Sequence, residues 1–434
     1  MNYPNTPGVK ISEVSLLPPS IVQVSTAIPI FLGYTESGTI GEAVRLTSLK
    51  EYIDIFGGAK KHTFSVDASF NVTAPTTLDY LFYENIKMYF LNGGGACYIL
   101  PVGHYSDAIT KTAFVDGIAL VDKLDEPTLI VFPEAVTLTN LVDYGSVAAA
   151  AQNLCFNTKE KFALIDSPNG ADLVGIGNVT DTYRDSLSGA ASYGAAYYPH
   201  LQVNLNYSID ETASTFDGVV LDTITSNANY EIALSAINKS VNVILPPSAL
   251  MAGVYAKIDR DFGVWKAPAN IPLQGVVKPM VAISDEMQEN LNVDATSGKS
   301  INAIRQFTGK GSVVWGARTL DGNSNEWRYI QVRRLFITVE ESVKKATSQF
   351  VFENNDSKTW VKVSSMIRSY LNGLWKEGAL TGATPDEAFF VQVGVGTTMT
   401  EQDVLEGKMI VQIGLAAVRP AEFIILEFSH FVNQ

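Results

Sequence analysis

The sequence predicts an α/β domain followed by an α+β domain, with an extended segment at each end. Short apolar strands alternate with helical patterns over the first part of the chain, which is typical of a largely parallel sheet covered by helices. After about residue 270 the strands cluster and two helices follow one another, as in an α+β domain. The 434 residues suffice for two or three domains of about 100–200 residues each.

The N-terminal segment, residues 1–20, is predicted to be an extended arm. Its prolines forbid a continuous helix, while Val9, Ile11 and Val14 alternate roughly with polar residues. One side of the segment is therefore apolar, and it needs a sheet edge to pair with. A strand-rich stretch follows from Ile21 to Tyr34.

The α/β domain is expected to cover residues 21–270. Ser48 and Glu51 form a capping-box pattern ahead of a helix that ends at Gly57. Further helices are expected over 78–89 and around 147–156. Buried strands are expected at 97–100, 128–132 and 162–165.

The α+β domain is expected to cover residues 271–415, with helices over about 335–352 and 360–375. The strands expected there are Val313–Trp315, Tyr329–Val332, Phe389–Val393 and Met409–Leu415. Residues 416–434 form the second arm. Its run Glu422–Phe428 is apolar on both faces and must enter a sheet, either its own or a neighbour's.

Composition restricts the possible partners. Lys and Arg number 31 against 45 Asp and Glu, a net charge of −14 that repels phosphate backbones, so no nucleic-acid partner is expected. Charged residues make up 18% of the chain where about 25% is usual, which fits a surface covered by other chains, with a large core within one chain as the alternative. No signal-peptide pattern and no membrane-length apolar run is found, so cytoplasmic synthesis without membrane insertion is expected.

The patterns that carry catalysis or cofactor binding are incomplete. Ser297-Gly298-Lys299-Ser300 resembles the end of a phosphate-binding loop, but Val293 stands where that loop needs its first glycine. The four histidines have no partners at metal-ligand spacing, and no GxSxG nucleophile elbow is present. We therefore expect no enzyme activity and no catalytic, cofactor or metal site.

A set of motifs runs along nearly the whole chain. The most specific begins with Leu245-Pro246-Pro247-Ser248 and continues through Ala252-Gly253-Val254-Tyr255-Ala256, Asp259 and Gly263-Val264-Trp265-Lys266-Ala267-Pro268-Ala269-Asn270. Others are Thr6-Pro7-Gly8-Val9, Phe31-Leu32-Gly33, Phe56-Gly57-Gly58, Asn92-Gly93-Gly94, Tyr197-Tyr198-Pro199, Ile301-Asn302-Ala303-Ile304-Arg305, Val314-Trp315-Gly316-Ala317-Arg318-Thr319-Leu320, Arg333-Arg334-Leu335, Gly378-Ala379-Leu380 and Arg419-Pro420-Ala421-Glu422-Phe423-Ile424. In this order the motifs resemble those of contractile tail sheath proteins, found in contractile phage tails, R-type pyocins and extracellular injection particles. The chain departs from the pattern at Leu17-Pro18-Pro19 and over residues 59–77, which are longer than a minimal sheath protein needs.

The resemblance implies an outer α/β domain, an inner α+β domain that faces a tube, and arms that pair with the sheets of neighbouring subunits. It also implies the partners: copies of the chain in a helical homo-oligomer, an inner tube protein, baseplate and tail-terminator proteins, and sister sheath proteins. Assembly in the cytoplasm would precede incorporation into a phage tail or a released extracellular particle. The implied function is to drive the tube through a target envelope when the lattice repacks.

Two groups of residues are candidates for contacts in such an assembly. The subunit contacts expected in the arms are Val9, Ile11, Val14, Phe423, Ile425 and Phe428, with packing inside the subunit as the alternative. The acids Glu401, Asp403 and Glu406 are expected to face basic groups on the tube, with a solvated loop as the alternative. A static shell protein and a cytoplasmic α/β hydrolase or transferase remain the competing functions.

Overall fold

The computed structural model describes residues 20–75, 78–138, 140–168, 170–171 and 179–422. These residues form two compact units. The larger unit comprises residues 24–341 and 419–422, and the smaller unit comprises residues 20–23 and 342–418. The sequence placed the domain boundary at residue 270, whereas the division falls within helix α9 (Ile330–Thr347), between Glu341 and Ser342.

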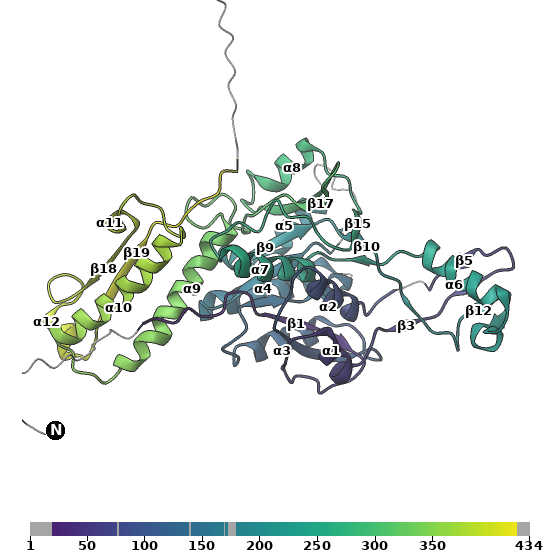
Figure 1. Cartoon of the computed structure of the whole chain (residues 1–434), viewed down its shortest axis with the longest axis horizontal. Coiled ribbons are helices and arrows are strands. Elements are labelled where there is room, and N and C mark those ends of the chain that lie inside the picture. Colours follow the sequence, from purple (N-terminus) through teal and green to yellow (C-terminus); the bar gives the residue numbers. More distant parts are fainter. Residues whose placement is uncertain (1–19, 76–77, 139, 169, 172–178, 423–434) are drawn as a thin grey trace, which may run out of the picture. The chain divides into compact units, whose positions relative to one another are not determined.

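An eight-stranded sheet forms the centre of the larger unit (Figure 1). Its strands, in spatial order, are β17 (Gly311–Val314), β16 (Ile301–Phe307), β9 (Gly194–Tyr198), β8 (Phe162–Asp166), β7 (Leu129–Val131), β1 (Pro29–Thr35), β6 (Cys97–His104) and β2 (Val44–Leu46). The six inner strands run parallel, and β17 and β2 pair antiparallel at the two edges. Because β16 and β17 complete this sheet, residues well beyond 270 belong to the larger unit.

Helices cover both faces of this sheet. Leu32 and Gly33 are neighbours on β1, so they face opposite sides of the sheet. A Cβ on Gly33 would meet the Phe82 ring of helix α2 (Phe82–Leu91), whereas a Cβ on Gly117 of helix α3 (Lys111–Val121) would meet Leu32. The helices α2 and α3 therefore lie on opposite faces. Helix α2 packs with α7 (Ser248–Phe262), and α3 packs with α4 (Leu141–Thr158).

The remaining elements of the larger unit lie around this core. They are α1 (Leu49–Phe56), η1 (Pro133–Thr137), α5 (Val179–Ser186), η2 (Ala191–Tyr193), α8 (Asp285–Asn292) and the antiparallel strands β14 (Ile244–Leu245), β10 (Leu201–Val203) and β15 (Val276–Pro279). No helix within the described ranges is long and apolar enough to cross a membrane.

Two segments far apart in the sequence form a small satellite subdomain, residues 61–73 and 208–240. Its elements are β3 (Lys61–His62), β4 (Ser65–Val66), β5 (Val72–Thr73), β11 (Ser208–Ile209), β12 (Thr215–Phe216), β13 (Val219–Val220), η3 (Leu221–Ile224) and α6 (Ala228–Ser240). Strand β3 pairs with β11, and β4 pairs with β12, so backbone hydrogen bonds between strands join the two segments. The rings of Phe70 and Phe216 stack inside this subdomain, with their centroids 5.1 Å apart. The first of these segments lies within residues 59–77, where the sequence departs from the motif pattern described above.

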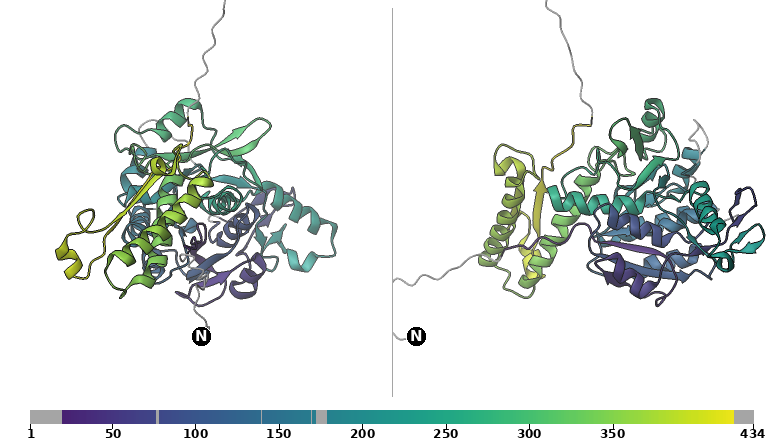
Figure 2. Two further views of the ribbon diagram at one scale, coloured as in Figure 1. Left: turned by 60° about the vertical axis from the view of Figure 1, so that its left-hand side comes forward. Right: turned by 45° about the vertical axis from the view of Figure 1, so that its right-hand side comes forward.

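The smaller unit is a helix packed against a two-stranded sheet (Figure 2). Its elements beyond the end of α9 are η4 (Ser348–Phe350), α10 (Ser357–Lys376), α11 (Pro385–Ala388), β18 (Phe389–Val393), α12 (Glu401–Leu405) and β19 (Val411–Leu415). The side chains of Phe389 and Val391 are buried, and α10 contacts β18.

The sequence-based elements agree with the structure at several points and fail at two. The helix over 49–56 is confirmed, with the Ser48 hydroxyl accepting from the Glu51 N–H. The strand predicted at Tyr329–Val332 is wrong, because helix α9 begins at Ile330. The first turns of α9 are buried on every side, so their sequence lacks the alternation of apolar and polar residues that marks a surface helix. The strand-rich stretch predicted from Ile21 yields a strand only from Pro29.

Candidate assembly sites

The arm residues named from the sequence, Val9, Ile11, Val14, Phe423, Ile425 and Phe428, lie outside the described residues. The described structure does contain the sheet edges that could receive an extended segment. It includes the points where the chain first enters the larger unit and where it returns to that unit. It also contains all three acids of the predicted tube-facing group.

The three acids lie at helix α12, and two of them already have partners within the unit. The Asp403 carboxylate accepts from the N–H and the hydroxyl of Thr400, at 2.9 and 2.7 Å, and completes a capping box. These hydrogen bonds lower the pKa of Asp403. The Glu406 carboxylate accepts from Lys408 at 2.6 Å and from Gln402 at 2.9 Å. Glu401 is exposed in the first turn of the helix.

In the antiparallel β18–β19 sheet, the register of the two strands determines which backbone N–H and C=O groups point to the partner strand and which point away from it. The Ala416 N–H donates to the Ala388 carbonyl, and the register continues unbroken from Phe389–Leu415 to Val393–Val411. In an antiparallel pair, residues alternate between bonded and non-bonded positions. The backbone groups of residues 388, 390 and 392 therefore face β19, and those of residues 389, 391 and 393 face away.

The same alternation applies to β19. The backbone N–H and C=O groups of Val411, Ile413 and Leu415 point away from β18. Among the described residues no strand pairs with this edge of β19. The outer edge of β18 is partly covered, because Arg368 on α10 donates to the Val391 carbonyl at 2.9 Å. The outer edge of β19 is therefore the more open place for another strand to add.

A buried arginine holds the chain where it enters the larger unit. The Thr26 carbonyl accepts from Arg334 Nη2 at 2.8 Å and from the Thr128 hydroxyl at 2.9 Å. Arg334 also donates to both carboxylate oxygens of Asp259, at 3.0 and 2.5 Å, and lies 4.6 Å from the centre of the Tyr255 ring. Arg334 is 3% exposed. The Thr26 carbonyl is thus fixed by groups from two other segments, and helix α7 holds the arginine in place.

A second buried arginine holds the chain where it returns to that unit after the smaller one. Arg318 donates from Nε and Nη2 to the two carboxylate oxygens of Glu422, and Asn292 donates to the same carboxylate at 3.1 Å. Burial raises the pKa of Glu422, but the hydrogen bonds from Arg318 and Asn292 outweigh it and lower the pKa below its ordinary value. Asn302 positions the arginine, accepting from the Arg318 N–H at 2.8 Å and donating to its carbonyl at 2.7 Å.

The motifs identified in the sequence supply these residues, but the sequence did not connect them. Asp259 and Arg334 come from separate motifs, as do Arg318 and Glu422. The available signal was a charged residue within an otherwise apolar motif, because such a residue needs a partner when buried.

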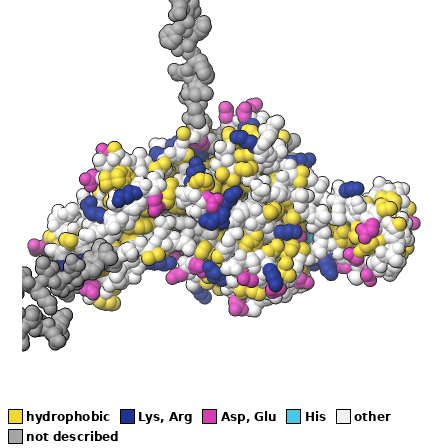
Figure 3. Space-filling view, viewed as in Figure 1, with side chains coloured by type: hydrophobic (Ala, Val, Ile, Leu, Met, Phe, Trp, Pro, Cys, Tyr) yellow, Lys and Arg dark blue, Asp and Glu magenta, His cyan; other side chains and the backbone are white. Residues whose placement is uncertain are grey.

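Figure 3 shows acidic and basic side chains interspersed on one face of the molecule, without an extended basic surface on that face.

Residues 323–430 match the family described as phage tail sheath C-terminal domain. Over the whole chain the structure resembles the PVC sheath complex of an extracellular contractile injection system in its contracted state. The TM-score is 0.72 and the identity 32%, covering 100% of this chain and 99% of that one. It also resembles the helical sheath of the anti-feeding prophage (AFP) in its contracted state, with a TM-score of 0.69, 33% identity and coverage of 98% and 99%.

Among curated proteins, the tail sheath protein of Vibrio phage KVP40 is 26% identical over 175 residues, which is 40% of this chain and 24% of that protein. The match thus spans about a quarter of that longer relative. The two full-length structural matches exceed 30% identity, and their sheath assignment agrees with the motifs, the fold and the C-terminal family match. The chain belongs to the contractile tail sheath protein family.

Proposed function

We propose that the chain is the repeating subunit of a contractile sheath in which terminal segments of one subunit pair with the β18–β19 sheets of its neighbours. The observation that carries this proposal is the open edge of β19 at Val411, Ile413 and Leu415. An extended segment that adds to such an edge gains backbone hydrogen bonds along its length, and alternate side chains set its register.

The two segments predicted from the sequence to be extended suit this role. Residues 1–20 and 416–434 carry the apolar side chains proposed as contacts: Val9, Ile11, Val14, Phe423, Ile425 and Phe428. Since each segment would leave one subunit and enter another, the contact is heterologous, and its repetition builds an open helical array. The arginine contacts at Thr26 and Glu422 would transmit force from such segments to the larger unit.

Contraction would follow from repacking of the subunits. An extended lattice around a tube would convert into a wider and shorter one that buries more surface. At about 25 cal/mol per Å², a few hundred Å² gained per subunit supplies several kcal/mol, multiplied over many copies. The structural relatives support this, because the PVC and AFP sheaths are both described in a contracted state.

The proposed orientation places the α+β part of the chain against the inner tube and the α/β part outward. Glu401 and Glu406 would then face basic groups on the tube, whereas Asp403 is engaged in the helix cap. Proposed partners besides other copies are the tube, baseplate and tail-terminator proteins and sister sheath proteins. Assembly would take place in the cytoplasm, before incorporation into a phage tail or a released extracellular particle.

Deletion of residues 1–15 tests the proposal. The truncated chain should remain folded, because the described contacts of the larger unit begin after this segment. When mixed with tube protein it should form no ordered sheath in negative-stain micrographs, whereas the full chain does. Sheaths of normal length that still contract would contradict the pairing of arms with neighbouring subunits.

A further inference from the structure

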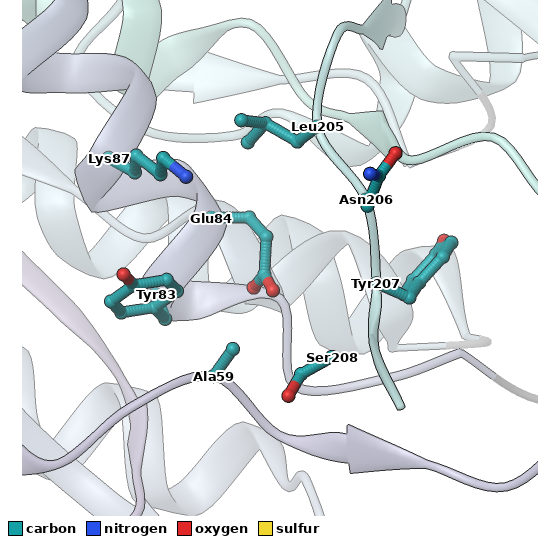
Figure 4. Close-up of a pocket in the computed structure, with 8 residues that line it drawn as sticks. All are labelled: Ala59, Tyr83, Glu84, Lys87, Leu205, Asn206, Tyr207 and Ser208. Atoms are coloured by element: carbon teal, nitrogen blue, oxygen red, sulfur yellow. The ribbon is translucent and has the colours of Figure 1, made fainter. Parts of the chain in front are cut away.

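A cavity of about 270 Å³ lies in the larger unit, next to the connections that lead into the satellite subdomain (Figure 4). Helix α2 contributes Tyr83, Glu84 and Lys87 to its wall. Residues 205–208, which join β10 to β11, form another part, and Ala59 lies just before β3. The cavity therefore lies between helix α2 on one side and the two segments that lead into the satellite subdomain, at Ala59 and at residues 205–208, on the other.

The side chain of Glu84 points into this cavity (Figure 4). Its residue is 3% exposed, and its Oε2 has no hydrogen-bond partner among the described residues. A buried carboxylate oxygen without a donor is costly, because the group has lost water and gained nothing in exchange. The wall of the cavity thus holds a buried acceptor that has no partner among the described residues.

The charged and titratable groups around Glu84 do not supply that partner. Lys87 is exposed one turn further along α2; its positive charge lowers the pKa of Glu84, but these two described side chains form no salt bridge. The carboxyl of Glu134 on η1 is buried and its pKa is raised to about 8, so this acid offers Glu84 no positive charge. The other titratable groups that interact electrostatically with Glu84 are the phenols of Tyr52, Tyr83, Tyr105 and Tyr207.

The chemistry of the wall favours a cationic donor. A charged N–H donor forms the strongest hydrogen bonds with a carboxylate, and Coulomb attraction rises as the site is shielded from water. The ring of Tyr83 lies beside Glu84 in Figure 4 and can take a cation on its face. Asn206 and Ser208 on the opposite wall offer acceptors for further N–H groups.

We propose that this cavity is a binding site for a protonated amine or guanidinium group, held by the Glu84 carboxylate. Two sources present this chemistry: a free small amine, and a lysine or arginine side chain of a second copy of the chain. In either case the bound group links α2 to the 205–208 connection and restrains the satellite subdomain. The site does not depend on the proposed function of the chain.

Agmatine, which carries both a guanidinium and an amine, is the probe. Isothermal titration of the unassembled full chain with agmatine should show binding that Glu84→Gln weakens by at least about tenfold, the loss expected for one charge-assisted hydrogen bond. Burial raises the pKa of Glu84 to about 7, so binding at pH 6.5 should release protons. Titrations in two buffers of different ionisation enthalpy measure that release, which Glu84→Gln should abolish.

Two further variants separate binding from folding. Ala59→Leu fills the cavity without changing the carboxylate and should also abolish binding. Lys87→Met removes a positive charge at the rim and should leave binding intact or tighten it. If the occupant is a basic side chain of another copy, assembled sheaths should no longer bind agmatine, whereas a site for a free amine should bind it in both states. Failure of the unassembled chain to bind agmatine, or equal binding by Glu84→Gln, would overturn the proposal.

Discussion

Arg318 and Glu422 form a bidentate ion pair, with Nε and Nη2 of the arginine 2.9 and 2.6 Å from the two carboxylate oxygens. The two residues are 104 positions apart in the sequence, and their side chains are 5% and 21% exposed. Two parallel N–H···O bonds fix orientation as well as distance. The last described residue of the chain is therefore held to the larger unit by a directional contact.

Replacing Glu422 with Gln should destabilise the larger unit. The substitution leaves Arg318 buried with a weaker partner, so we expect the free energy of unfolding to fall by about 2–3 kcal/mol. Glu406→Gln is the matched control: its pair with Lys408 is exposed, with side chains 44% and 58% accessible, so its loss should change the free energy of unfolding far less. Urea unfolding followed by tryptophan fluorescence measures both. Equal effects would show that the Arg318 contact adds no stability.

Gly253 is expected to be required for the packing of α7 against α2. A Cβ at this position would lie 2.5 Å from the Tyr89 carbonyl oxygen, which is backbone and cannot move aside freely. Gly253→Ala should therefore lower stability by about 1–3 kcal/mol. Gly373 on α10 has no atom within 4 Å of its Cβ position, so Gly373→Ala should raise stability by about 0.5–1 kcal/mol. Thermal unfolding of both variants should show a lower melting temperature for Gly253→Ala and a higher one for Gly373→Ala.

Glu134 should make the larger unit less stable as the pH rises. Its burial raises its pKa to about 8, above the ordinary 4.5, although the Tyr34 N–H donates to it. Between pH 4.5 and pH 8 the unfolded chain has lost the Glu134 proton, whereas the folded chain retains it. The contribution of Glu134 to the free energy of unfolding is therefore highest below pH 4.5. We expect a loss of about 1.4 kcal/mol per pH unit between pH 6 and 8.

Glu134→Gln cannot ionise and should remove this part of the pH dependence. Urea unfolding of the two proteins at pH 6, 7 and 8 gives the comparison. The neighbouring carboxyl of Glu84, whose pKa burial raises to about 7, should leave a smaller dependence in the variant. Identical slopes for the two proteins would mean that Glu134 does not retain its proton in the folded state.

Local patterns in the sequence predicted many elements of the fold. The helix over 49–56 carries its own cap at Ser48, and the strands over 162–165 and 389–393 are short apolar or alternating runs, so neighbouring residues decide them. The start of α9 was missed, because Ile330 and Val332 favour a strand locally and only tertiary burial makes them helical. The division at Glu341 was missed because it falls inside that continuous helix.

The candidate sites were predictable only in part. The motifs around Arg318, Arg334, Asp259 and Glu422 could be identified, but their pairing depends on contacts between distant segments, which a single sequence does not contain. The open edge of β19 depends on the register of its ladder with β18. The cavity at Glu84 depends on where residues 205–208 pass α2, and its sequence signal is only an acid in the first turn of a helix.

The most direct test of strand addition replaces Ile413 with Pro. The Ile413 N–H points away from β18, so its loss leaves the β18–β19 ladder intact and removes a donor only from the open edge. Gln412→Pro is the control that should damage the subunit itself, because the Gln412 N–H faces β18. Electron microscopy of Ile413→Pro mixed with tube protein, alongside its thermal unfolding, should show a subunit of normal stability that forms no sheath. Sheaths of wild-type length and order would contradict the account.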